Sequence, residues 1–279
     1  MQLPDFLIQP VIQRGLEEDL ARGGDLTTQS IISPEQQAQV ALVARADGVV
    51  AGGACPRLSW AAVDPRIQVE YLVQDGEQVV AGQEIARATG PAVGLLMGER
   101  VGLNLLCRLS GIATATARMQ RLIAHTSAHI VDTRKTTPGL RALEKYAVRC
   151  GGGKNHRFGL DDAVLIKDNH IAVAGGIEQA VSAARKSLGH MVKIEVEVDT
   201  LEQLQQLLAF NVDAVLLDNM SPETLRQAVK LVDGAFLTEA SGGITPETVV
   251  AVAEAGVDMI SMGWLTHSAP ILDVGLDYR

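Results

Sequence analysis

Positively charged side chains are concentrated in one stretch of an otherwise acidic chain. Residues 132–170 contain eight lysines and arginines against five aspartates and glutamates, a balance of +3. The whole chain carries a formal net charge of -9, so the remainder carries -12. Cations clustered in this way either pair locally with acids or face a small anionic ligand. Both alternatives stay open for Arg134 and Lys135, which lie close enough to Asp132 in the chain to pair with it.

A glycine run in the same stretch predicts a loop that carries more cations. Residues 151–162 read GGGKNHRFGLDD, and three successive glycines are unfavourable inside a helix. The positive charges could be balanced by Asp161 and Asp162 of the same loop. Alternatively, His156 and Arg157 face an anionic substrate, because arginine binds carboxylates and phosphates through two parallel hydrogen bonds.

The second half of the chain alternates short apolar runs with stretches of helical spacing. This alternation predicts parallel strands joined by right-handed crossovers. Six such units within about 135 residues favour a β/α barrel, complete or partial, in which catalytic side chains lie at the C-terminal ends of the strands. The predicted strands lie at 129–135, 163–169, 192–198, 213–219, 235–241 and 258–264.

Charged residues at or near the ends of these runs are candidates for catalysis. Lys167 lies inside a strand pattern, where a lysine needs a partner, so an ion pair with Glu197 and Schiff-base chemistry are both open. Glu195 and Glu197 have the same parity and are expected to point the same way. Glu197 and Asp218 suit a metal ion with its polyphosphate, ribose hydroxyls or a developing positive charge.

Glycines after the last two predicted strands favour phosphate binding. SGGIT at 241–245 follows the fifth strand, and MGWLTHS at 262–268 follows the sixth. Glycine allows backbone N–H groups to approach a phosphate, and a following helix N-terminus favours negative charge. These two junctions are the usual phosphate site of β/α barrels, although ordinary turns would give the same pattern.

The first half of the chain has a different pattern of apolar and polar residues. Residues 39–46 and 67–73 alternate as half-buried strands do, and 75–92 contains turn glycines typical of a hairpin. A helical pattern from residue 92 to about 124 contains a predicted break near Ser110–Gly111. We therefore predict an α/β fold with an α+β N-terminal domain and helical bridge over 1–113, and a β/α barrel over 114–269.

Composition argues against several classes of partner. Aromatic residues make up 3 % of the chain, and the acidic balance adds to the expectation that no nucleic acid is bound. We expect neither a signal peptide nor a membrane association, because no apolar run reaches the roughly 18 residues of a span. Cys55, Cys107 and Cys150 are widely spaced, which indicates no disulfide framework and favours the cytoplasm.

Several of these motifs together resemble the quinolinate phosphoribosyltransferase family. They are DTRKTTPGLRALEKYAV, GGGKNHRFGLDDAVLIKDNH, EVEV, VLLDN and EASGGI, together with EEDLARGGDLTT and GERVGLNLLCRLSGIATAT nearer the N-terminus. The resemblance covers nearly the whole chain. It implies an incomplete parallel β/α barrel, with residues 270–279 returning to the N-terminal domain. It also implies transfer of phosphoribose from phosphoribosyl pyrophosphate (PRPP) to quinolinate with decarboxylation, giving nicotinate mononucleotide, pyrophosphate and carbon dioxide in NAD biosynthesis.

The resemblance further implies a role for individual residues. Lys135, Lys167, Glu197 and Asp218 would be catalytic, and Glu197 and Asp218 would hold Mg²⁺, directly or through water. The active unit would be a homodimer in which Arg100 reaches the neighbouring subunit's site, with further assembly left open. The substrate-binding set would be Arg100, Arg134, Lys135, Thr136, His156, Arg157, Lys167, Glu197, Asp218, Ser241, Gly242, Gly243, Met262, Gly263, Trp264 and His267.

Three other functions are compatible with the residues. A transferase of the same fold could use another acceptor, as in the homologue associated with molybdate transport. An unrelated barrel lyase could use Lys167 as a Schiff base. An anion-binding or regulatory protein could keep the fold and bind ligand without turnover.

Overall fold

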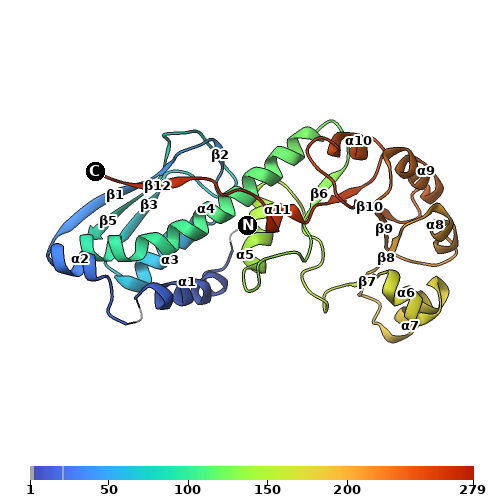
Figure 1. The fold of residues 1–279 in the computed structure, drawn as a ribbon, viewed down its shortest axis with the longest axis horizontal. Coiled ribbons are helices and arrows are strands. Elements are labelled where there is room, and N and C mark those ends of the chain that lie inside the picture. The colour runs from blue at the N-terminus through green and yellow to red at the C-terminus, as the bar shows by residue number, and fades with distance from the viewer. Residues whose placement is uncertain (1–2, 21) are drawn as a thin grey trace. The chain divides into compact units, whose positions relative to one another are not determined.

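A computed structural model describes residues 3–20 and 22–279, which divide into two compact units (Figure 1). The first unit contains the residues up to Ala117 together with Thr136–Gly152 and Leu265–Arg279. The second contains Arg118–Lys135 and Gly153–Trp264. The predicted limits of the two domains were 1–113 and 114–269. In the structure, the segment that carries helix α5 (Arg141–Cys150) belongs to the first unit instead of the second.

The first unit is built on a four-stranded antiparallel sheet in the order β12-β1-β5-β3. The last strand pairs with the first, with Val40 opposite Tyr278, so the C-terminal segment belongs to this sheet. Its core includes the fully buried Trp60, Leu95 and Leu106. The strands of this unit are β1 (Gln37–Ala44), β2 (Gly48–Val49), β3 (Gln68–Tyr71), β4 (Gln78–Val79), β5 (Glu84–Pro91) and β12 (Val274–Tyr278). The helices before β6 are α1 (Asp5–Leu20), α2 (Leu26–Ile31), α3 (Ala54–Val63) and α4 (Ala92–Leu122).

The predicted break near Ser110–Gly111 is wrong, because α4 runs without interruption for 31 residues. The hydroxyl of Ser110 is fully buried and donates to the carbonyl of Ala51, while it accepts from the backbone N–H of the same residue. Gly111 allows close packing: a Cβ there would lie 2.1 Å from the carbonyl oxygen of Pro270. The small and polar pair therefore marks a tight contact on the helix rather than its end.

The second unit is a six-stranded parallel sheet in the order β6-β11-β10-β9-β8-β7. Within the described residues the sheet has no pairing between its end strands β6 and β7, so the predicted incomplete barrel is confirmed. The strands are β6 (His129–Val131), β7 (Val164–Ile166), β8 (Ile194–Val198), β9 (Ala214–Asp218), β10 (Leu237–Ser241) and β11 (Met259–Ser261). The remaining helices are α6 (Asp168–Ala174), α7 (Ile177–Ser187), α8 (Leu201–Leu207), α9 (Pro222–Val232), α10 (Val249–Ala253) and α11 (Trp264–His267).

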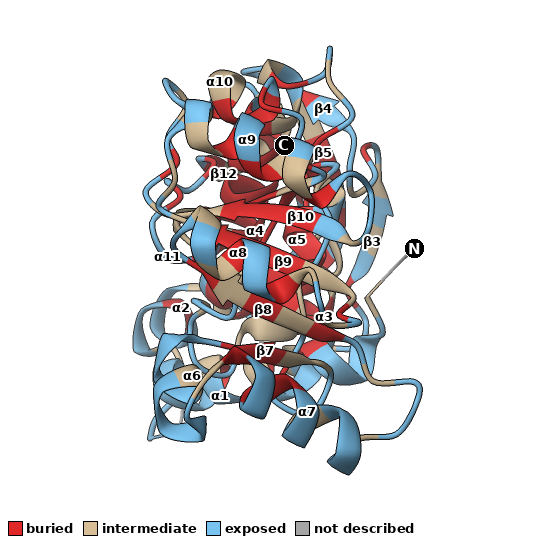
Figure 2. Cartoon of the chain, turned by 90° about the vertical axis from the view of Figure 1, so that its right-hand side faces the viewer, coloured by how far each residue is buried: buried red, intermediate tan, exposed pale blue. Residues whose placement is uncertain are grey.

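Helix α9 shows how local sequence sets these elements. The side chain of Ser221 accepts from the backbone N–H of Thr224, and Pro222 occupies the first turn, where its missing N–H is harmless. Leu225, at the start of the apolar face, is buried. Figure 2 shows strands β7 to β10 side by side, with helices such as α8 and α9 turning exposed faces outward.

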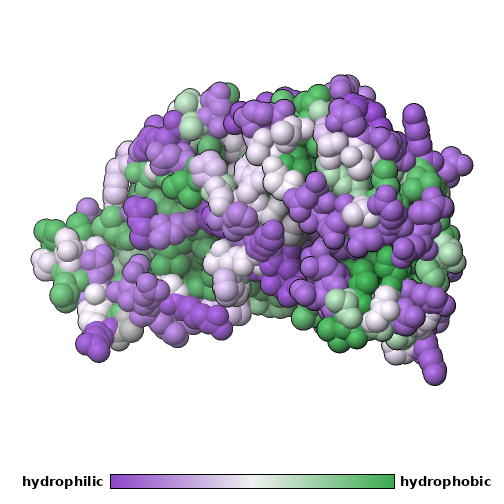
Figure 3. All heavy atoms as spheres, turned by 45° about the vertical axis from the view of Figure 1, so that its right-hand side comes forward, coloured by the Kyte–Doolittle hydropathy of each residue, from purple (hydrophilic) through white to green (hydrophobic). Residues whose placement is uncertain are grey.

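No helix in the described ranges is long and apolar enough to cross a lipid bilayer. On the face drawn in Figure 3, hydrophilic side chains predominate and hydrophobic ones occur in scattered patches. The large apolar side chains are mostly buried, as Ile130, Val196 and Leu217 are in the second unit.

We predict that Gly111→Ala lowers the free energy of unfolding of the first unit by about 1–3 kcal/mol, because the added methyl group must displace the backbone at Pro270. Alanine would otherwise stabilise a helix interior by about 1 kcal/mol relative to glycine. Urea denaturation is the measurement. Gly23→Ala is the control, because its Cβ would meet Leu26 at an ordinary 3.8 Å. An unchanged or higher urea midpoint for Gly111→Ala would refute the close contact.

Candidate active site

A cavity of about 380 Å³ opens at the C-terminal ends of the parallel strands. Eight of the predicted site residues line it: Arg134, Lys135, His156, Arg157, Lys167, Glu197, Asp218 and Ser241. The wall is completed by Thr133, Leu165, Leu216, Glu239 and Ser261. Segments that are up to 128 positions apart in the sequence therefore meet in one polar pocket of the second unit.

Asp132 anchors the glycine-rich loop against the end of strand β6. Its carboxylate is fully buried and accepts hydrogen bonds from Asn155 Nδ2 at 2.5 Å and from the backbone N–H of His156 at 2.9 Å. The backbone N–H of Lys154 also donates to the carbonyl of Ile130 at 2.9 Å. These contacts direct His156 and the residue after it into the pocket. Asp132 thus holds a loop in place, in addition to any pairing with the cations that follow it.

Arg157 lies among other cations in a partly buried position. Burial, followed by the positive charge of Arg134, lowers the pKa of the Arg157 guanidinium. Its Nη1 donates to the carbonyl oxygen of Ala163 at 2.9 Å. Asp162 accepts from the backbone N–H of Phe158 at 2.7 Å, so it stabilises the loop itself. Cations that disfavour one another in this way are stabilised by a bound anion.

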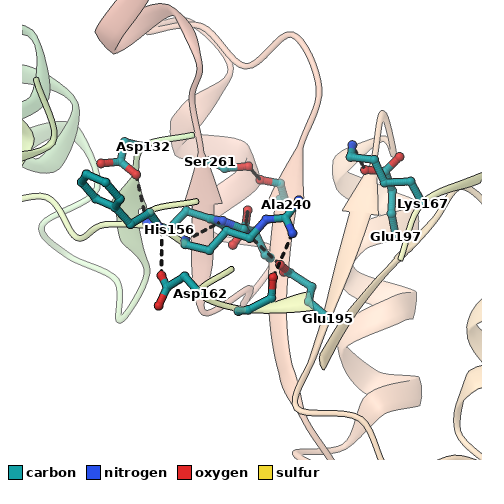
Figure 4. A network of polar contacts seen from close by, with 12 residues as sticks. Asp132, His156, Asp162, Lys167, Glu195, Glu197, Ala240 and Ser261 are labelled. Carbon is teal, nitrogen blue, oxygen red and sulfur yellow. Dashed lines mark hydrogen bonds and ion pairs between the residues drawn. The ribbon is translucent and has the colours of Figure 1, made fainter. Parts of the chain in front are cut away.

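Lys167 forms an ion pair with Glu197, with 2.5 Å between Nζ and Oε2 (Figure 4). The lysine nitrogen donates to the Glu197 carboxylate and is therefore used in this pair. The alternative of an ion pair with Glu197 is therefore the arrangement found. Asp218 ends strand β9, and its Oδ2 accepts from the side chain of Asn219 at 2.6 Å.

The glycines after strand β10 lie close to the end of strand β9. Gly242 has φ of 103°, and a Cβ there would lie 2.2 Å from Asn219 Oδ1, so a side chain has no space. Gly243 has φ of 56° and faces open space. After the sixth strand, the backbone N–H of Met262 donates to Val131, and Trp264 Nε1 donates to Ile244. Gly242 therefore allows a close approach of the two strand ends, and phosphate binding at these junctions stays a prediction.

Three predicted residues belong to the first unit. The hydroxyl of Thr136 accepts from Arg141 Nε at 2.9 Å, and His267 Nδ1 lies 2.6 Å from the hydroxyl oxygen of Ser268. Arg100 lies on helix α4, where its side chain is 64 % exposed and pairs with Glu99 at 3.3 Å. Their roles at the pocket stay predictions, as do those of Gly242, Gly243, Met262, Gly263 and Trp264.

Glu239 and Glu195 lie in predicted strands with polar ends, but the predicted site residues do not include them. Glu239 lines the cavity and is 2 % exposed, although it lies in the middle of strand β10 rather than at its end. Glu195 Oε2 lies 2.8 Å from His156 Nε2. An acid inside a buried strand was the available signal, because such a group needs a specific partner.

A second cavity, of about 410 Å³, lies in the first unit and contains none of the predicted residues. Its central acid, Asp75, already accepts from the backbone N–H groups of Gly52 and Gly53 and from the hydroxyl of Tyr146. Burial raises the pKa of the Cys55 thiol far above its usual range, so this cysteine is no nucleophile. The polar groups of this cavity therefore stabilise the fold, and the chemistry is expected in the second unit.

Comparison with known families matches both parts of the chain. Residues 25–110 match the model of the quinolinate phosphoribosyl transferase N-terminal domain, and residues 112–277 match that of its C-terminal domain. A probable nicotinate-nucleotide pyrophosphorylase (carboxylating) of Bacillus subtilis is 49 % identical over 260 residues, which cover 93 % of this chain and 89 % of that protein.

More distant relatives show the same pattern. The chloroplastic nicotinate-nucleotide pyrophosphorylase (carboxylating) of Arabidopsis thaliana is 40 % identical over 291 aligned residues, covering 98 % of this chain and 83 % of that protein. The solved structure of the nicotinate-nucleotide pyrophosphorylase of Francisella tularensis superposes with a TM-score of 0.95 at 38 % identity. That superposition covers 100 % of this chain and 98 % of the other.

We predict that Asp132→Ala destabilises the second unit by about 1–3 kcal/mol, because it removes a buried carboxylate that accepts from Asn155 and from the backbone of His156. The loop at 151–162 should also become more sensitive to limited proteolysis. Asp161→Ala is the control, since Asp161 is an exposed acid of the same loop. Equal urea midpoints and cleavage rates in the two variants would contradict the anchoring role.

Proposed function

The chain belongs to the quinolinate phosphoribosyltransferase family, and we propose that its pocket carries out the reaction for which that family is named. Phosphoribose passes from PRPP to quinolinate with loss of carbon dioxide, giving nicotinate mononucleotide and pyrophosphate for NAD synthesis. The observation that carries this proposal is the gathering of Arg134, Lys135, Arg157 and Lys167 around one cavity. Such a set suits substrates that bring two carboxylates and a pyrophosphate.

The transfer step follows from the charges in the pocket. As the bond from ribose to pyrophosphate breaks, positive charge develops on the ribose carbon, and the carboxylates of Glu197 and Asp218 stabilise it. Arg134, Lys135 and Arg157 hold the anionic groups of both substrates. The pyridine nitrogen then attacks the ribose carbon with its lone pair. Catalysis is by positioning and electrostatics, and it needs no covalent nucleophile.

Decarboxylation follows from the charge on the new product. Once the ring nitrogen is bonded to the ribose carbon, the ring is a positively charged pyridinium. The carbon–carbon bond to the adjacent carboxylate can then break. Carbon dioxide leaves, and the electron pair stays on the ring carbon next to the positive nitrogen until a proton from solvent neutralises it. The cations of the pocket hold the remaining carboxylate during this step.

We assign Mg²⁺ to Glu197 and Asp218, directly or through water. Oxygen ligands match this ion, and the two half-buried carboxylates line the same cavity as the cations. When bound, Mg²⁺ would neutralise part of the pyrophosphate charge. Within the protein, Lys167 orients the Glu197 carboxylate through their ion pair.

We place the enzyme in the cytoplasm. Cys55, Cys107 and Cys150 are all free thiols in the structure, and the first two are buried. Unpaired cysteines are typical of reducing compartments.

We predict that Lys167→Ala and Arg157→Ala each lower the rate of nicotinate mononucleotide formation by about 100-fold or more, because each removes a preorganised charge. The fold should persist, as judged by circular dichroism. Lys193→Ala is the control, because Lys193 pairs with Asp213 at 2.7 Å in the same unit but does not line the pocket. Near wild-type turnover in either pocket variant would show that the substituted residue has no important role in the reaction.

We also propose that the active unit is a homodimer in which Arg100 of one subunit completes the other subunit's site. The support is its exposed guanidinium on helix α4 and the family resemblance. We predict that Arg100→Ala and Lys167→Ala are each nearly inactive alone, and that co-expressing the two restores about a quarter of wild-type activity. Mixed dimers would contain one site with both residues intact. Activity that stays at the level of the single variants would contradict a site shared between subunits.

A further inference from the structure

A cluster in the pocket wall, of which one member is buried and two are partly buried, has no role in the mechanism above. It consists of His156, Glu195 and Glu239, whose side-chain nitrogen and oxygen atoms lie within 4.8 Å of one another. His156 Nε2 is 2.8 Å from Glu195 Oε2 and 3.7 Å from Glu239 Oε1. Among the described residues, Glu239 Oε1 is a buried side-chain oxygen with no hydrogen-bond partner. Figure 4 shows His156 and Glu195 together, apart from the pair of Lys167 and Glu197.

The contacts of the His156 ring determine where its proton lies. Nδ1 is 2.8 Å from the backbone nitrogen of Arg157, and a backbone N–H can only donate. Nδ1 is therefore the acceptor, and the ring proton lies on Nε2, which donates to Glu195. Both ring nitrogens are used inside the protein. The imidazole is a neutral link between the buried acids and the backbone of Arg157.

The same tautomer argues against a metal ion in this cluster. Histidine and two glutamates are suitable ligands for a divalent cation. However, ligation by Nε2 requires its lone pair, which would move the ring proton to Nδ1. The proton would then face the N–H of Arg157, and two donors would oppose each other.

The surroundings of Glu239 favour its neutral form. Burial, followed by the negative charge of Glu195, raises the pKa of Glu239 to about 7. Asp132 acts in the same direction, whereas the hydroxyl of Ser261 opposes it. The cations lining the cavity above it are Arg134, Lys135, Arg157 and Lys167. If both acids were ionised, two negative charges would lie next to each other beside a neutral imidazole, which is unfavourable at the buried Glu239.

We propose that Glu239 carries its proton in the form of the enzyme that binds substrate, and that it acts with Glu195 and His156 as a set of positioning residues for Arg157. The neutral acid limits the cluster to a single negative charge beside the anion-binding side chains. Ionisation of Glu239 would add a second charge, which would repel an anionic substrate and disturb the alignment of Arg157. Substrate binding should be affected more than the chemical step.

Glu239→Gln tests this proposal, because glutamine has the shape of the protonated acid and cannot ionise. We expect the KM of the wild type for quinolinate to rise by about threefold or more between about pH 6 and pH 8, while that of the variant changes much less. The matched control is Glu254→Gln. Glu254 also faces a histidine, His125, at 3.2 Å in the same unit, but both side chains are half-exposed.

Identical pH profiles of KM in the wild type and Glu239→Gln would overturn the proposal. So would a severe loss of activity in the variant at about pH 6, because the negative charge itself would then be required. One equivalent of bound divalent metal in the wild type that disappears in the variant would also overturn it, since the cluster would then be a metal site.

The kinetic test rests on the proposed function, whereas infrared spectroscopy and urea unfolding do not. The wild type alone should show a protonated-carboxyl band that disappears as pH rises through about 7 and that is absent from Glu239→Gln. A pKa raised above its ordinary value of 4.5 stabilises the fold at low pH, and this stabilisation is lost as pH rises through the folded-state pKa. The urea midpoint of the wild type should therefore fall relative to that of the variant over this range. If the protein shows the band but has no turnover, the proposed reaction is wrong and the protonated acid at Glu239 stands. If the band is absent, the protonated acid is refuted.

Discussion

Repulsion between like charges in one half-buried pocket is the constraint on which the rest of the second unit depends. Burial, followed by the positive charge of Arg134, lowers the pKa of the Arg157 guanidinium, as is expected where cations share a partly buried site. Bringing several cations to one pocket is unfavourable in the absence of an anion, so contacts such as the ion pair of Lys167 with Glu197 must hold them there. The same arrangement favours an anionic substrate, because the charges are already in place when it binds.

Three structural features hold the cations in position. The parallel sheet brings the C-terminal ends of its strands to a common edge, so short loops suffice to place the charged side chains. Buried Asp132 ties the glycine-rich loop to the end of strand β6. Beside it, Glu195 supplies negative charge next to the pocket, and His156 connects this acid to the backbone of Arg157.

Much of this architecture could be predicted from the sequence, because short apolar runs with polar ends are typical of buried strands followed by loops. The six strands, a barrel that is complete or partial, and polar side chains at its rim followed from that pattern, whereas the incomplete form of the barrel was implied by the family resemblance. The continuity of helix α4 did not, since Ser110 and Gly111 look like a break unless their contacts with Ala51 and Pro270 are known. The contacts of Glu239 also depend on tertiary structure, because the facing side chains come from β8 and from the loop after β6.

The central claim is that the surplus of cations selects an acceptor with two carboxylates. The most direct measurement is a product assay in which the purified protein, PRPP and Mg²⁺ are offered quinolinate or nicotinate in parallel. The account predicts nicotinate mononucleotide with an equal amount of carbon dioxide from quinolinate, and no nucleotide from nicotinate. Nucleotide formed from nicotinate, or no product from either acceptor, would contradict it.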